Sequence, residues 1–375
     1  MKYYIIAGEA SGDLHGSNLI KSLKLKDKNA EIRFWGGDLM KAQGGTLIKH
    51  YNELAFMGFL TVLLHLKTIL NNIKFCKNDI KEFKPDVIIL IDYPGFNLRI
   101  AKFAHNSGFK VYYYISPKIW AWKQSRIKKI KKFIDKMYVI FPFEKEFYNK
   151  FNYSVDFQGN PLIDALENRE GKNESFSEFI LKNNLEDKPI ISLLAGSRKQ
   201  EIKMILPEML KIIDFYKDYQ FVIAAAPSIE EEFYQQFIND RNVKIIFDQT
   251  YQIVQQSDAA LVTSGTATLE TALLSTPQVV CYKFKGGKYA FLLGMSLLKV
   301  KYISLVNLIM NDEVIKELIQ HNLNIKNLKI ELDNILFDKE YRQKMLDNYK
   351  TLKNKMGKSG ASDRVVGLIY KSLQK

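Results

Sequence analysis

The chain has 375 residues, of which 47% are hydrophobic and 26% are charged. This composition excludes an intrinsically disordered chain, and the length exceeds that of one ordinary core, so two domains are expected. The formal charge of +14, from 55 Lys and Arg against 41 Asp and Glu, favours an anionic partner such as nucleic acid, phospholipid or a phosphorylated substrate, although a general bias toward lysine is an equally good explanation.

The N-terminus and the cysteines indicate the compartment. The first apolar run, Tyr3 to Ala7, is too short for the apolar region of a signal peptide. Cys76 and Cys281 lie far apart in the sequence, which favours small core residues over a disulfide in a reducing compartment. We therefore expect a cytoplasmic protein.

Short apolar runs alternate with amphipathic helical stretches through most of the chain. The runs predicted to be strands are 3–7, 32–36, 87–92, 111–116 and 137–141 in the first half, and 190–194, 221–225, 243–247, 259–262 and 278–282 in the second. After Asn311 the pattern is helical throughout. Such alternation predicts α/β architecture, with two doubly wound, Rossmann-like domains of parallel strands facing a central cleft. The predicted domains are 1–165 and 166–345, with helices in 346–375 that pack back on the body.

In doubly wound domains, ligands bind beyond the carboxyl ends of the strands. The first such loop runs from Ala7 to Gly16 and lacks the glycine spacing of a dinucleotide site. A plain structural turn needs neither Glu9 nor Asp13, so we expect the loop to line a substrate site, with a capped turn as the alternative.

Asp92 follows four apolar residues at the end of a predicted strand. A carboxylate in a partly dry site can take a proton from a weakly acidic hydroxyl as a new bond forms. Aspartate is also a favoured cap for a following helix. The sequence leaves both interpretations open.

Two loops in the second half resemble anion-binding turns at helix N-termini. Gly196, Ser197 and Arg198 combine a glycine turn, helix amides and a guanidinium, which suits a diphosphate. In the second loop, Ser264, Gly265 and Thr266 lead into a helix that carries Glu270, a candidate acceptor for ribose hydroxyls. A capping box explains part of this pattern without a ligand, but two such loops favour nucleotide binding.

No Asp-x-Asp pair, histidine-rich cluster or cysteine pair with metal-ligand spacing occurs in the sequence. We therefore expect no metal and no other cofactor, with leaving-group charge met by Arg198 and backbone amides.

Two segments suggest contact with lipid. Residues 54–70 are strongly apolar and include Phe56, Met57, Phe59 and Leu63, but His65 and Lys67 interrupt the run. Residues 118–136 predict a basic amphipathic helix, with apolar side chains on one face and Lys128, Lys129, Lys131 and Lys132 away from it. The apolar stretch 289–300 points weakly the same way. The alternative for residues 54–70 is a buried helix. The alternative for residues 118–136 is a solvated outer helix.

Motifs spread over nearly the whole chain match the pattern of one family. They are AGEASGD at 7–13, MGF at 57–59, KPD and IDYPGFN within 84–97, SPKIWAW at 116–122, PFEKEFY at 142–148, LLAGSR at 193–198, SDAALVTSGTATLE at 257–270 and YISLVNLI at 302–309. The set is highly specific, and the chain resembles lipid-A-disaccharide synthase.

The resemblance implies a GT-B fold and inverting transfer of 2,3-diacylglucosamine from UDP-2,3-diacylglucosamine to 2,3-diacylglucosamine 1-phosphate. It assigns the acceptor to the first domain and the UDP-sugar to the second. It points to Glu9, Asp13 and Asp92 as catalytic residues and to Arg198, Glu270 and Asn307 as donor-site residues. It also implies a protein peripheral on the inner face of the inner membrane, on an anionic lipid surface, with a homodimer left open.

Three positions depart from the family pattern. Thr61 lies in the segment where an acidic residue is expected after MGF, Asn160 replaces the histidine of a Gly-His-Pro motif, and Val306 replaces a proline. These changes affect the prediction of which acyl chains the enzyme prefers more than the prediction of which reaction it catalyses. The alternatives are a UDP-sugar 2-epimerase on the same scaffold, which needs no lipid surface, and a basic nucleic-acid-binding protein. The second leaves both anion-binding loops unexplained, so we expect no nucleic-acid partner.

Overall fold

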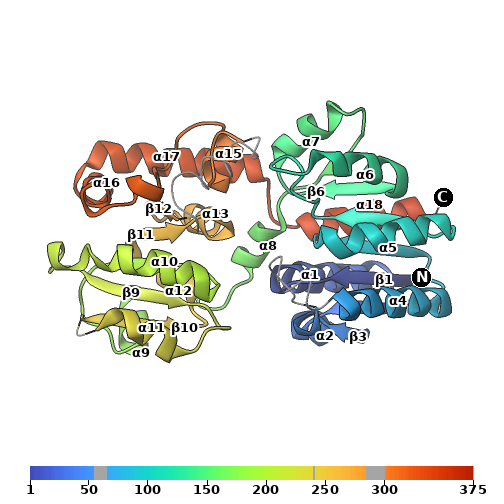
Figure 1. The fold of residues 1–375 in the computed structure, drawn as a ribbon, viewed down its shortest axis with the longest axis horizontal. Helices are drawn as coiled ribbons and strands as arrows, with labels where there is room; N and C mark the ends of the chain where they lie inside the picture. The colour runs from blue at the N-terminus through green and yellow to red at the C-terminus, as the bar shows by residue number, and fades with distance from the viewer. Residues whose placement is uncertain (55–65, 240, 284–299, 375) are drawn as a thin grey trace. The chain divides into compact units, whose positions relative to one another are not determined.

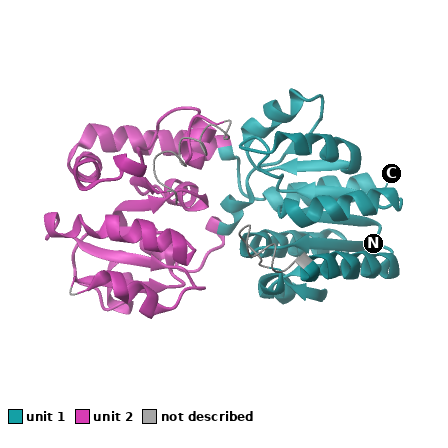
Figure 2. Ribbon diagram, viewed as in Figure 1, with its two compact units in different colours: residues 1–165, 356–375 teal, residues 166–355 magenta. Residues whose placement is uncertain are grey.

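A computed structural model describes residues 1–54, 66–239, 241–283 and 300–374. The chain divides into two compact units, each with its own parallel sheet (Figure 2). Unit 1 contains Met1–Ala165 and Met356–Lys375, and unit 2 contains Leu166–Lys355.

The sheet of unit 1 has the order β3-β2-β1-β4-β5-β6-β7, and every pair of neighbours is parallel. Its strands are β1 (Lys2–Ala7), β2 (Glu31–Gly36), β3 (Thr46–His50), β4 (Val87–Ile91), β5 (Lys110–Tyr114), β6 (Lys136–Val139) and β7 (Asp156–Phe157). The central strand β4 is buried along its whole length, because helices cover both faces of the sheet. Chain order reverses between β1 and β4, which is where a doubly wound sheet binds its ligand.

Helices pack on each face of this sheet over a separate apolar cluster (Figure 1). On one face lie α4 (Leu66–Phe83), α5 (Pro94–Asn106), α6 (Ile127–Phe133) and α7 (Pro142–Asn149). On the other lie α1 (Ala10–Lys26), α2 (Asp38–Ala42) and the C-terminal α18 (Ala361–Leu373). Alternate residues of β1 supply both clusters, with Tyr4 and Ile6 on one face and Tyr3 and Ile5 on the other. This period of two is what a strand between two helical layers requires.

Unit 2 repeats the scheme with the strand order β10-β9-β8-β11-β12-β13, again all parallel. The strands are β8 (Ile190–Leu194), β9 (Gln220–Ala225), β10 (Val243–Phe247), β11 (Ser257–Thr263), β12 (Gln278–Tyr282) and β13 (Glu317–Ile319). The helices are α9 (Phe176–Lys182), α10 (Lys199–Leu210), α11 (Glu231–Ile238), α12 (Thr250–Gln255), α13 (Thr266–Leu273), α15 (Leu305–Met310), α16 (Ile325–Phe337) and α17 (Lys339–Met356). The predicted pair of doubly wound parallel sheets is therefore confirmed.

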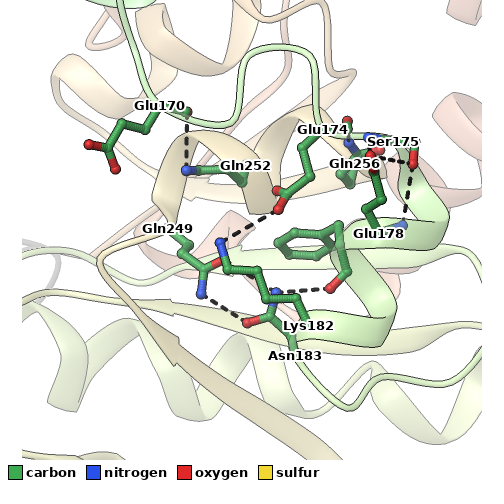
Figure 3. Close-up of polar contacts among 10 residues, drawn as sticks. Glu170, Glu174, Ser175, Glu178, Lys182, Asn183, Gln249, Gln252 and Gln256 are labelled. Carbon is green, nitrogen blue, oxygen red and sulfur yellow. Dashed lines mark hydrogen bonds and ion pairs between the residues drawn. The ribbon is translucent and has the colours of Figure 1, made fainter.

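The segment that follows α8 (Pro161–Glu167) is fastened to unit 2 by side-chain amides on and beside α12 (Figure 3). Gln252 donates to the carbonyl of Glu170 at 3.2 Å, Gln255 to that of Lys172 at 3.0 Å, and Gln256 to that of Glu174 at 2.6 Å. Asn183 and Gln249 exchange two further amide hydrogen bonds. The backbone carbonyls of this segment, which belong to no sheet, thus receive their hydrogen bonds from the glutamine side chains of α12 and the residue after it.

The structure differs from the sequence prediction in several elements. The region after Asn311 is not all helical, because Glu317–Ile319 forms β13 and pairs with β12. The edge strands β3 and β7 were not predicted; β3 is only partly buried and β7 has two residues, so neither has a long apolar run. The helix α17 continues through the boundary predicted at residues 345 and 346.

The predicted basic helix at 118–136 is shorter than expected. A 3-10 turn occupies Gln124–Arg126 and α6 begins at Ile127. Lys123 has a left-handed backbone, with φ of 53°, which excludes a continuous helix through this position. Both cysteines are free and buried, as predicted. Within the described ranges, no helix combines the length and apolar character needed to span a bilayer.

Candidate active site

The loop between β1 and α1 brings backbone and an acidic side chain to the sheet edge. A Cβ on Gly8 would lie 2.3 Å from the Tyr93 ring, so only glycine permits this close approach. The next residue, Glu9, is the partly exposed N-cap residue of α1 and its side chain makes no cap hydrogen bond. Burial raises the pKa of Asp92 and of Tyr93, and the negative charge of Glu9 adds to both shifts, which places Glu9 among the groups that act on the β4 end.

Asp13 is buried and holds the start of α2. Its carboxylate accepts hydrogen bonds from the backbone amides of Gly37 at 2.7 Å and of Leu39 and Met40 at 3.1 Å each. Three backbone amide donors satisfy the hydrogen-bonding needs of this buried side chain. The Asp13 side chain therefore holds the backbone of the loop after β2.

Asp92 lies directly beyond β4 on an unusual backbone. Asp92 and Tyr93 have φ of 43° and 45°, the left-handed region that non-glycine residues rarely adopt. The buried amide of Asn97 donates to the carbonyl of Asp92 at 2.8 Å, and the Tyr113 hydroxyl donates to the same oxygen. These bonds hold strained backbone in place at the sheet edge. The N-cap of α5 is Tyr93, so Asp92 lies one residue before the cap position.

The surroundings of Asp92 tune its acidity. Burial raises the pKa of this carboxyl to about 6, and the charge of Glu9 acts in the same direction. The charges of Lys118 and Arg126 oppose this shift. A carboxylate with such a pKa is ionised at pH 7 yet remains a better proton acceptor than ordinary aspartate.

A second buried carboxylate, which the sequence analysis did not single out, anchors the loop after β5. The Ser116 hydroxyl donates to Glu144 Oε1, and the amides of Ile140 and Phe141 donate to Oε2 at 3.1 Å and 2.9 Å. Burial raises the pKa of Glu144 to about 7. In the sequence, Glu144 is marked only by its place in PFEKEFY. That position is equally typical of the third helical residue of a capping box.

The lysines assigned to lipid contact are exposed on α6. Lys128, Lys129, Lys131 and Lys132 are exposed, whereas Ile127, Ile130 and Phe133 are buried against the sheet. The Nζ of Lys131 donates to the carbonyl of Phe151 at 2.7 Å. The other residues assigned to lipid contact, Phe56, Met57, Phe59 and Leu63, lie outside the described residues, as does most of 289–300.

In unit 2 the loop after β8 is arranged around Glu201. Gly196 has φ of 115°, and a Cβ there would lie 2.7 Å from Glu201 Oε2. The Ser197 amide donates to Glu201 Oε2 at 3.3 Å, and Arg198 Nη1 donates to Oε1 at 3.1 Å. Arg198 is the exposed N-cap residue of α10. Glu201 therefore orients the Arg198 guanidinium, a role that was not predicted. The only indication in the sequence was an acidic residue in the first helical turn after LLAGSR.

The loop after β11 ends in the N-terminus of α13, without the capping box considered from the sequence. Gly265 is the N-cap, and the Ser264 hydroxyl donates to the carbonyl of Ile303 at 3.0 Å. Thr266 is exposed at the first helical position. Burial raises the pKa of Glu270 to about 7, and the hydroxyl of Tyr251, which the sequence analysis did not include, donates to it at 3.4 Å.

Asn307 is fully buried and its amide is saturated. Its Nδ2 donates to the Ile315 carbonyl at 2.8 Å and to Glu317 Oε1 at 3.0 Å. Its Oδ1 accepts from the amides of Val314 at 2.9 Å and Ile315 at 3.0 Å. All four hydrogen-bonding positions of the side chain are therefore used within unit 2.

Two of the positions that depart from the family pattern, Asn160 and Val306, are buried. Asn160 is buried; its Nδ2 donates to the Ile140 carbonyl at 3.0 Å and its Oδ1 accepts from the Leu162 amide at 2.8 Å at the start of α8. Val306 is buried in α15. Thr61 lies outside the described residues.

Solved structures with the same architecture include UDP-GlcNAc 2-epimerase from Neisseria meningitidis bound to UDP-GlcNAc, with a TM-score of 0.72, 15% identity and coverage of 99% of this chain and 100% of that one. A glycosyltransferase of kitacinnamycin matches with a TM-score of 0.68, 11% identity and coverage of 99% of both chains. At these identities the similarity shows the fold, the two-domain GT-B arrangement of Rossmann-like sheets, and not the reaction.

The sequence comparisons are more specific. Residues 3–366 match the family model for lipid-A-disaccharide synthetase. The chain is 37% identical to lipid-A-disaccharide synthase of Syntrophus aciditrophicus and 35% identical to that of Geobacter metallireducens, in each case over 99% of this chain and 97% of the relative. The enzyme of Coxiella burnetii is 36% identical over 98% of this chain and 97% of its own length. The chain therefore belongs to the lipid-A-disaccharide synthase family of glycosyltransferases.

Proposed function

We propose that this chain transfers 2,3-diacylglucosamine from UDP-2,3-diacylglucosamine to 2,3-diacylglucosamine 1-phosphate, giving the β-1,6-linked disaccharide 1-phosphate and UDP. Asp92 is the general base. The observation that carries this assignment is a partly buried carboxylate at the β4 end with a pKa raised to about 6 and cations close by. In the reaction, Asp92 accepts the proton of the acceptor hydroxyl. The oxygen of that hydroxyl bonds to the anomeric carbon of the donor sugar as the bond from that carbon to UDP breaks.

Unit 2 binds the donor in this proposal. Gly196, Ser197 and Arg198 receive the diphosphate at the N-terminus of α10, where amide groups and a guanidinium oriented by Glu201 favour negative charge. Ser264, Gly265 and Thr266 supply a second helix N-terminus, and Glu270 accepts the ribose hydroxyls. Arg198 and these amides stabilise the departing UDP without a metal ion.

Glu9 acts beside the base in this scheme by keeping the Asp92 pKa high. Asp13 and Asn307 act as positioning residues, because Asp13 already accepts three amide hydrogen bonds and Asn307 has no hydrogen-bonding capacity left.

The acylated substrates place the enzyme at an anionic membrane surface, on the inner face of the inner membrane. The exposed lysines of α6 support a reversible electrostatic attachment, and the apolar residues Phe56, Met57, Phe59 and Leu63 are proposed to contact acyl chains.

The decisive assay measures UDP release in detergent with the acylated donor, in the presence and absence of the acylated acceptor. We expect release that depends on the acceptor, with formation of the disaccharide 1-phosphate detected by mass spectrometry. Epimerisation of the donor sugar without an acceptor, or UDP release that ignores the acceptor, would contradict the transferase assignment.

A further inference from the structure

The loop after β5, residues 116–126, carries a group of cations that the transfer scheme does not yet use. Strands β4 and β5 pair in parallel, with Ile91 opposite Tyr114, so the loop begins beside Asp92. The Asp92 amide also donates to the Tyr114 carbonyl at 3.3 Å. Lys118, Lys123 and Arg126 lie on this loop, and the charges of Lys118 and Arg126 act on Asp92.

The backbone of the loop is fixed in position. Ile115 has φ of 62°, which is strained for a β-branched residue and re-aims the chain at the end of β5. Ser116 is tied to Glu144, and Ile119 and Trp120 are buried. The Trp120 ring packs edge-on against Phe143 at 5.1 Å between centroids. A loop held by buried anchors presents its exposed side chains with little loss of conformational entropy on binding.

The exposed side chains of the loop surround an indole ring. Trp122 is 48% exposed, the Lys123 Nζ lies 4.2 Å from its ring centroid, and the Arg126 guanidinium lies 5.9 Å from it. The charges of Lys118 and Arg126 both act on Asp92, and that of Arg126 also acts on Tyr113, whose hydroxyl bonds the Asp92 carbonyl. Lys118 and Arg126 therefore lie close enough to the strand ends to act on Asp92, and the Trp122 ring lies beside both Lys123 and Arg126.

Some cations of unit 1 are neutralised by a carboxylate, but the three on this loop have no such partner among the described residues. Arg33 pairs with Asp79 at 2.6 Å, and Lys49 pairs with Glu53. By contrast, within the described ranges no carboxylate lies within ion-pair distance of Lys118, Lys123 or Arg126. Like charges gathered on a fixed loop repel one another, and a bound anion removes that repulsion.

We propose that Lys118, Lys123 and Arg126 form the subsite for the phosphate monoester of the acceptor sugar, with the Trp122 indole packing along the sugar or its acyl chains. This inference rests on the proposed function. A phosphate monoester carries close to two negative charges and three acceptor oxygens, which suits a guanidinium and two ammonium groups. Binding a phosphate remote from the reacting hydroxyl holds that hydroxyl against Asp92, so the phosphate contributes to turnover as well as to affinity.

The test compares two acceptors in neutral detergent micelles, 2,3-diacylglucosamine 1-phosphate and the same sugar with a free 1-hydroxyl. UDP release is measured for the parent, Lys123→Gln and Arg126→Gln. We expect each variant to raise the KM for the phosphorylated acceptor roughly tenfold, the usual effect of losing one charge-assisted contact, with an unchanged KM for the donor. With the free 1-hydroxyl acceptor, parent and Lys123→Gln are expected to react equally poorly.

Lys102→Gln is the matched control, because Lys102 is an exposed cation on α5 that belongs neither to the cluster nor to the proposed membrane contact. It should behave as the parent with both acceptors. Lys123→Gln is the sharper of the two test variants, since Lys123 is not among the charges that shift Asp92 and its loss leaves the base unaltered.

Equal losses on both acceptors, or an equal loss in Lys102→Gln, would overturn the phosphate subsite. A defect that vanishes in neutral micelles and appears only on vesicles containing phosphatidylglycerol would identify the cluster as a membrane contact instead, and would also overturn it. If the parent releases no UDP with the phosphorylated acceptor, the proposed function itself fails and the subsite fails with it.

Discussion

In unit 1 the carboxyl end of β4 carries a partly buried carboxylate on left-handed backbone, whereas in unit 2 the ends of β8 and β11 carry glycine turns that lead into helix N-termini. Both regions follow parallel strands of doubly wound sheets. In the first, burial of a titratable group sets the chemistry; in the second, amide groups and a guanidinium provide fixed positive charge. In the proposed function, the same architecture therefore serves proton transfer in one unit and anion binding in the other.

The largest expected effect tests the unit 1 half of this contrast. Asp92→Asn should lower kcat by ~10²- to 10⁴-fold, because the general base is lost, while UDP binding to unit 2 stays at the parental level. Stopped-flow or steady-state assays and UDP titration measure the two effects. Asp13→Asn is the matched control: it removes a carboxylate that holds three amides, so its expected defect is in thermal stability. Near-parental turnover in Asp92→Asn would falsify the assignment of the base.

The second test asks whether membrane attachment belongs to unit 1. Each lysine near an anionic surface contributes about 1 kcal/mol, so changing Lys128, Lys129, Lys131 and Lys132 to Gln should weaken vesicle binding by about 4 kcal/mol. The control changes four exposed lysines of α17 in unit 2 to Gln: Lys339, Lys344, Lys353 and Lys355. Sedimentation with anionic vesicles at low and high salt measures both. Equal binding by the α6 variant and the parent would make these lysines a solvated face only.

The third test separates support from binding within unit 2. Asn307→Ala leaves the buried amide of Ile315 without its side-chain acceptor, whereas the Val314 amide keeps the Asp312 carbonyl at 3.1 Å, so we expect the free energy of unfolding to fall by about 2 kcal/mol. Urea unfolding followed by circular dichroism measures this change. A variant with parental stability but weakened UDP binding would show that Asn307 contacts the donor directly.

The fourth test addresses the charge that unit 2 offers to the diphosphate. Arg198→Ala should weaken UDP binding by roughly tenfold or more, and Glu270→Ala should also weaken it, with little change in stability. Isothermal titration calorimetry measures the affinities. Glu201→Gln should have a smaller effect, since it loosens the guanidinium without removing it. EDTA should leave the parental rate unchanged; inhibition that magnesium reverses would contradict a metal-free leaving group.

The smallest effects concern pH. Because Asp92 must be ionised to accept a proton, activity should fall as the pH drops through about 6. Lys118→Gln removes a charge that favours the ionised form and should move this limb to higher pH; Glu9→Gln removes an opposing charge and should move it lower. The acidic limb of the pH profile is measured as kcat/KM for the acceptor at saturating donor. Because Glu270 belongs to the proposed donor site, saturation with donor keeps its titration near pH 7 out of the profile. Shifts in the same direction would refute this electrostatic scheme.

The sequence was sufficient for the parallel strands and the strand-end loops, since long apolar runs bounded by glycine and charged residues have few other folds. It did not reveal β13, β3 or β7, whose short or half-buried segments form strands only because a neighbouring strand offers a ladder. Glu201 and Tyr251 were missed for a related reason: an acidic residue in a first helical turn and a tyrosine in a helix are common, and only their partners give them a role.

What the sequence determined by itself was the family, the doubly wound architecture and the positions of Asp92, Arg198 and Glu270 at strand ends and helix starts, because these depend on local pattern and motif. The tertiary structure alone decided which polar side chains hydrogen-bond to backbone groups distant in the sequence. Asp13 and Asn307 carry the residue types of a site, yet amides distant in the sequence occupy their hydrogen-bonding groups. The acidity of Asp92 was likewise decided by burial and by Glu9, Lys118 and Arg126, whose proximity arises only when β1, β4 and β5 pair.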